Sequence, residues 1–79
     1  MTDFTDVVDG FTYRAEWSRT SVGRIKWIAT VRNSQGDLCG LPKGEFSQQD
    51  LTDVQCQQAV QMHVEAAITF GSGVDRGGR

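Results

Sequence analysis

The sequence predicts an α+β fold, a three-stranded antiparallel β-meander packed on one face by a single C-terminal α-helix. Two consecutive stretches between residues 11 and 33 alternate apolar and polar side chains, which is the period of a half-buried strand. A later stretch, from about residue 51 to 70, repeats apolar residues at helical spacing. With 79 residues the chain is long enough for one small domain, and its elements follow the order β-β-β-α.

The two ends of the chain differ from the region between them. Residues 1–10 carry Asp3, Asp6 and Asp9 and show no sustained period, so they are expected to form an N-terminal acidic segment. Residues 11–70 are expected to form the single α+β domain. Residues 71–79 contain four glycines, a composition that predicts a disordered Gly-rich tail.

The strands are separated by turn-forming residues. The first strand spans residues 11–19, and the second spans 24–33 after a turn in which Gly23 suits the left-handed position. A second turn at residues 33–36 leads to a short third strand over 37–41, which ends at Pro42, the only proline. Trp17 and Trp27 share the parity of the other large apolar residues, so both are expected on the face that the helix covers.

The helix has two candidate N-caps. Ser47 with Asp50 offers a capping box, supported by Phe46 against Leu51 as a hydrophobic staple, whereas Thr52 followed by Gln55 offers a start one turn later. Gly71 ends the helix in either case. The predicted core consists of Phe11, Tyr13, Trp17, Ile25, Trp27, Val31, Leu38, Phe46, Leu51, Val60, Val64 and Ile68.

Charge is distributed unevenly along the chain. Residues 10–44 hold six basic and two acidic residues, although the net charge of the whole chain is -2. Alternation places most of these cations on the sheet face that the helix leaves open, together with one apolar residue. The candidate partner-binding residues are Arg14, Arg24, Lys26, Ile28 and Arg32.

This basic face has three possible explanations. It is a solvated strand surface if Glu16 pairs across the strands with Lys26 or Arg24. It is a protein-binding surface, or it contacts the phosphates of a nucleic acid. Binding of single strands is disfavoured because the aromatic rings on which bases stack are expected on the opposite face.

The sequence offers little that is typical of catalysis or cofactor binding. Cys39, Cys56 and His63 do not follow the paired spacing of a zinc site, and the last two lie about two helical turns, or roughly 10 Å, apart. The carboxylates are scattered, and the glycines lack a strand–loop–helix context for phosphate. We therefore expect no catalytic residues, no metal and no cofactor. Two cysteines, no secretory leader and no long apolar run favour a cytoplasmic protein.

These patterns favour a small non-enzymatic interaction protein. We expect it to bind a protein partner as an inhibitor or accessory factor, of the kind that phages or mobile elements carry, and a nucleic-acid-binding module is the alternative. One helix is too narrow to cover three strands fully. Either the N-terminal segment completes the core or a second copy covers it, so a homodimer is also expected.

Overall fold

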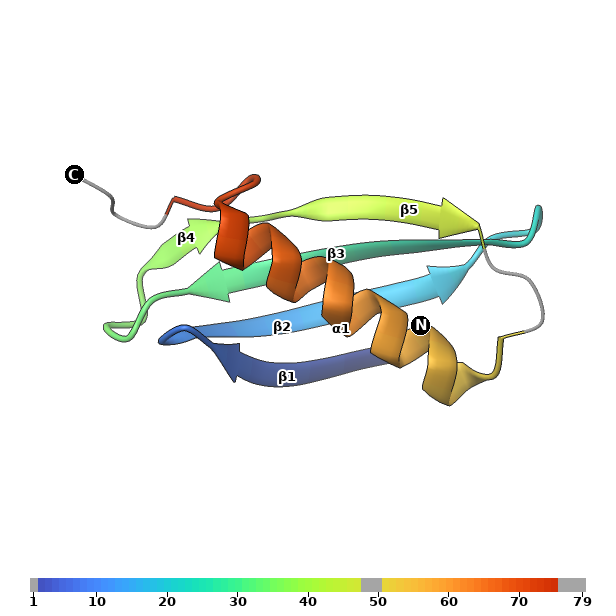
Figure 1. The fold of residues 1–79 in the computed structure, drawn as a ribbon, viewed down its shortest axis with the longest axis horizontal. Helices are drawn as coiled ribbons and strands as arrows, with labels where there is room; N and C mark the ends of the chain where they lie inside the picture. The colour runs from blue at the N-terminus through green and yellow to red at the C-terminus, as the bar shows by residue number, and fades with distance from the viewer. Residues whose placement is uncertain (1, 48–50, 76–79) are drawn as a thin grey trace.

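The computed structural model describes residues 2–47 and 51–75 and has an antiparallel sheet with one C-terminal helix, which confirms the α+β class (Figure 1). The sheet has more strands than the three expected. In chain order the elements are β1 (Thr2–Val8), β2 (Phe11–Arg19), β3 (Arg24–Arg32), β4 (Leu38–Gly40), β5 (Lys43–Ser47) and α1 (Asp53–Phe70).

All strands pair antiparallel, in the order β1-β2-β3. β4 and β5 both pair with the remaining edge of β3, β4 near Val31 and β5 between Arg24 and Ile28. The sheet is therefore four strands wide, because β4 and β5 follow one another along the same edge. The helix α1 runs obliquely across one face of this sheet (Figure 1).

The acidic N-terminal residues form β1, an element that the sequence analysis did not assign. Asp9 and Gly10 have positive φ angles of 52° and 82°, which is the two-residue type I′ turn that joins antiparallel strands. Phe4 and Val8 pack against the core from β1. This segment thus completes part of the core that one helix leaves uncovered.

The two predicted alternating strands form as expected. Trp17 of β2 lies opposite Trp27 of β3, and both side chains are buried on the helix side of the sheet. Gly23, with a φ of 77°, lies in the turn between them.

The third strand is shorter than predicted, and a strand that was not predicted follows it. β4 covers three residues, and Pro42 lies between β4 and β5. Leu38 was expected in the core, but this was wrong: its side chain is 54% exposed, because it pairs with Arg32 on the side of the sheet away from the helix. Phe46, expected as a staple beside the helix start, belongs to β5 and is partly buried.

The helix begins at the second of the two candidate caps. The Thr52 hydroxyl accepts a hydrogen bond from the Gln55 amide, and the Gln55 side chain accepts one from the Thr52 amide, which completes a capping box. Ser47 instead lies in β5. Gly71 ends the helix in the left-handed conformation, with a φ of 73°. The buried helix residues are Cys56, Val60, Val64 and Ile68.

The segment after the helix returns to the sheet. Val74 is buried and forms a β-bridge with Gly40, and the Asp75 amide donates to the Cys39 carbonyl at 2.8 Å. The disorder expected for residues 71–79 thus does not hold for the first five, because Val74 adds to the core. The other four lie outside the described residues. No helix in the described ranges is long and apolar enough to cross a membrane.

Candidate functional site

The face of the sheet opposite α1 is exposed to solvent, and no described element covers it. We call it the open face. Strand alternation and register bring side chains from β1, β2, β3 and β5 together there. Its residues are Asp3, Thr5, Val7, Thr12, Arg14, Glu16, Ser18, Arg24, Lys26, Ile28, Thr30, Arg32, Lys43, Glu45 and Ser47.

All five candidate partner-binding residues lie on the open face, but carboxylates reach two of the four cations. Arg14 forms an ion pair with Asp3 of β1, and the Arg24 Nε donates to Glu45 of β5 at 2.8 Å. Neither acid was expected there, because β1 and β5 were not predicted. The open face therefore carries charges of both signs.

The predicted pairing of Glu16 with Lys26 or Arg24 does not match the register. Glu16 lies opposite Ile28, while Lys26 lies between Ser18 on one side and Glu45 on the other. Arg32 donates through Nη1 to the Gly36 carbonyl at 3.0 Å.

The Arg14–Asp3 pair holds both groups in their charged forms. The hydrogen bond and the charge of Arg14 lower the pKa of the Asp3 carboxyl, and Asp3 in turn raises the pKa of the Arg14 guanidinium. Because Asp3 already offsets the charge of Arg14, a phosphate would gain less from contacting this guanidinium.

Ile28 is the apolar centre of the open face. It is 41% exposed and borders a shallow hollow of about 260 Å³. The other residues that line this hollow are Glu16, Trp17, Ser18, Lys26 and Trp27. A second hollow of about 370 Å³ lies between Thr5, Arg14 and Arg32. These depressions are too open to enclose a small substrate, but they add relief to a surface that a protein can contact.

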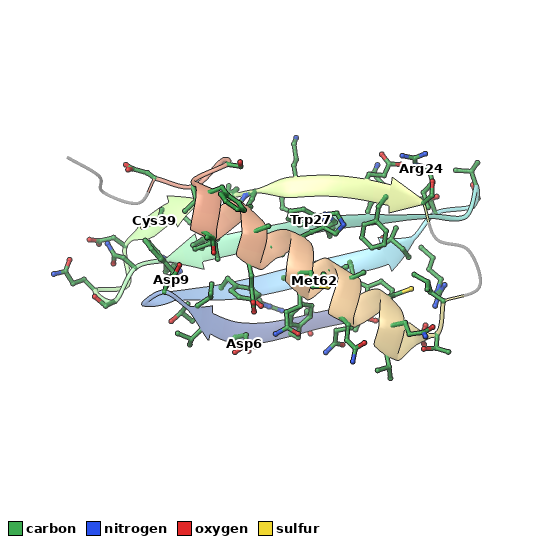
Figure 2. All side chains as sticks on the ribbon, viewed as in Figure 1. Asp6, Asp9, Arg24, Trp27, Cys39 and Met62 are labelled. Carbon is green, nitrogen blue, oxygen red and sulfur yellow. The ribbon has the colours of Figure 1, made fainter. Side chains whose placement is uncertain are left out.

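A further concavity lies on the helix side, between α1 and β5, and sequence reasoning missed it. We call it the β5 groove, and its volume is about 570 Å³. Figure 2 shows Trp27 between α1 and β5. The sequence signal that could have revealed the strand β5 beside the groove is the apolar Phe46 within an alternating five-residue run after Pro42. The groove is lined by Trp27, Leu41, Pro42, Lys43, His63, Ala66, Ala67, Phe70, Ser72 and Gly73.

The chain's only histidine has a packing role at this groove. The His63 ring stacks on Phe46, with centroids 4.8 Å apart and planes 6° apart, and lies 6.1 Å from the Trp27 ring. Cys56, in contrast, is a residue of α1 itself and is buried. Within residues 2–47 and 51–75, no group of three or more His, Cys, Asp or Glu residues is arranged to hold a metal ion.

A polar network joins the helix to the first two strands. The Tyr13 hydroxyl donates to Glu65 at 2.9 Å, and the Gln61 amide donates to both Glu65 and Asp6. Burial, and then the negative charge of Glu65, raise the pKa of Tyr13 well above its ordinary value. The phenol therefore stays protonated and acts as a hydrogen-bond donor that fixes the helix on the sheet.

Comparison of the chain with protein-family models, with curated proteins and with solved structures found no match.

Proposed function

We propose that this protein is a non-enzymatic interaction protein that binds a protein partner through the open face of its sheet. The observation that carries the proposal is the composition of that face, where charges of both signs surround the exposed Ile28. Protein interfaces combine an apolar centre with a polar rim. The proposed role is that of an inhibitor or accessory factor in the cytoplasm, of the type carried by phages or mobile elements.

The charges indicate what the partner's surface must offer. Arg14 and Arg24 have carboxylate partners within the chain. Among the described residues, the open-face cations with no such ion pair are Lys26, Arg32 and Lys43. A complementary surface would place carboxylates around an apolar contact for Ile28. A nucleic acid fits less well, because Asp3, Glu16 and Glu45 would lie close to its phosphates.

The proposal is tested by affinity capture from the native host, with the partner identified by mass spectrometry and its binding then measured with purified proteins. Ile28→Asp should weaken binding at least tenfold, because it places a charge at the apolar centre. The matched control is Met62→Asp on the outer side of α1, where Met62 is 72% exposed (Figure 2). If Met62→Asp abolished binding and Ile28→Asp did not, the open face would not be the interface.

A further inference from the structure

The outer edge of β5 is not paired with any strand in residues 2–47 and 51–75. On the same side of β3, the edge of β4 is already occupied, because Val74 forms a bridge with Gly40 and Asp75 donates to Cys39. No described segment pairs with β5 other than β3. A strand edge of this kind can pair with a strand from another chain.

The register determines which backbone groups of β5 face outward. The Ala29 amide donates to the Pro42 carbonyl at 2.9 Å, and pairing then alternates along the strand. The backbone groups of Gly44 and Phe46 consequently face β3, opposite Trp27 and Ile25. The amides and carbonyls of Lys43, Glu45 and Ser47 point away from the sheet, toward the position of an added strand.

We propose that this edge pairs with the same edge of a second copy, antiparallel and centred on Gly44. In this register Lys43 lies opposite the partner's Glu45, and Glu45 opposite the partner's Lys43. Glu45 also forms an ion pair with Arg24 of its own chain, so its carboxylate would be shared between two cations. The Lys43 and Glu45 side chains are both on the open face, because they align with Ile28 and Lys26 of β3. The two-fold symmetry therefore forms two opposite-charge pairs from one Lys-Gly-Glu segment.

The register also sets Gly44 opposite the partner's Gly44, a pair that has no side chains to obstruct close approach. A register centred on Glu45 would instead place two glutamates opposite each other, which is unfavourable. Charge pairing thus favours the register centred on Gly44.

The dimer would join the two open faces into one continuous surface, because antiparallel strands in one sheet are related by a two-fold axis perpendicular to it. Both helices would lie on the other side. This inference does not depend on the proposed function, since pairing of β5 requires no further partner.

The test is to measure the oligomeric state of the full chain by sedimentation velocity at protein concentrations between about 10 µM and 1 mM. Weak interfaces have dissociation constants on the order of these concentrations. We expect a concentration-dependent dimer. Lys43→Glu should weaken it about tenfold or more, because both pairs become repulsive, and Glu45→Lys should do the same. The exchanged variant Lys43→Glu/Glu45→Lys should restore the dimer. The matched control is Arg32→Glu, an equal charge change on the same face away from β5, which should leave dimerisation unchanged.

Hydrogen exchange identifies the edge independently. The amides of Lys43 and Glu45 should gain protection as the concentration rises, while that of Thr5 in the outer strand β1 should not. Circular dichroism confirms that each variant is folded. A wild-type protein that is monomeric at 1 mM, or a dimer that neither single reversal weakens, would overturn the proposal.

Discussion

The indole ring of Trp27 lies directly over Gly44 of the neighbouring strand. A Cβ atom at position 44 would be only 2.9 Å from the ring's Cζ2 and 3.0 Å from its Nε1. Trp27 is 8% exposed, and its indole N–H has no hydrogen-bond partner among the described residues. The glycine thus lets a large aromatic side chain cover the edge strand, and the two residues form one packing unit.

This contact predicts a specific coupling between the two positions. Gly44→Ala should lower the free energy of unfolding by about 1–3 kcal/mol, because the added methyl group forces the ring or β5 to move. In a Trp27→Phe background the same change should cost less, since the smaller ring leaves room. A double-mutant cycle with urea unfolding measures the difference. Equal costs in both backgrounds would mean that the ring does not determine the identity of residue 44.

The strand that contains Gly44 shows why part of the fold could not be predicted. β2 and β3 alternate apolar and polar residues, with Ile28 as the exception, so their faces followed from the sequence. Their register did not, because Glu16 lies opposite Ile28 and not opposite Lys26 or Arg24. β5 offers only one large apolar side chain, Phe46, because the position under Trp27 must be glycine. That requirement comes from a residue on another strand, so a local period cannot reveal it.

β1 was missed for a different reason. Its core-facing positions include Asp6, which accepts a hydrogen bond from Gln61, and this polar residue interrupts the apolar period. The Asp9-Gly10 pair was a usable hairpin signal. Missing β1 and β5 also affected the candidate site. Its five residues could be placed on one face from β2 and β3 alone, but the carboxylates that pair with Arg14 and Arg24 come from β1 and β5.

The opposite exposures of Lys26 and Trp27, which are neighbours in sequence, yield a second prediction. Trp27→Ala should destabilise the domain by roughly 3–5 kcal/mol, because it leaves a large cavity in the core. Lys26→Ala on the open face should change the unfolding free energy by less than about 0.5 kcal/mol. Urea denaturation followed by circular dichroism compares them. The reverse order would mean that the faces of β3 are assigned wrongly.

The start of the helix can be tested at its two candidate N-caps, Thr52 and Ser47. Thr52→Ala should cost about 1 kcal/mol, because it removes the hydroxyl that accepts from the Gln55 amide. Ser47→Ala should cost less than about 0.5 kcal/mol, since Ser47 is exposed in β5. Thermal unfolding of both variants provides the comparison. A larger loss for Ser47→Ala would place the cap one turn earlier.

Tyr13 predicts a loss of stability at alkaline pH. Burial and Glu65 raise the pKa of the folded phenol above its unfolded value of about 10. The contribution of the protonated phenol to the free energy of unfolding is therefore complete below about pH 10. Above that pH it falls by about 1.4 kcal/mol per pH unit, because the unfolded state loses the proton first. Tyr13→Phe should remove this component of the pH dependence. Since the chain has one tyrosine, phenolate absorbance follows the group directly. Ionisation near pH 10 without unfolding would contradict the buried hydrogen bond to Glu65.

The ion pairs on the open face predict how the protein responds to nucleic acid. Wild-type protein should bind duplex DNA negligibly at physiological salt, because Asp3 and Glu45 occupy Arg14 and Arg24. Asp3→Asn/Glu45→Gln should release both cations and raise affinity at low salt, with a log–log salt slope of about -3 or steeper if three or four phosphates are contacted. The control Asp37→Asn/Asp75→Asn makes the same change in net charge elsewhere. Micromolar binding of DNA by the wild type, unaffected by either double variant, would instead support nucleic-acid binding. In that case the charges of both signs on the open face would not indicate a protein interface.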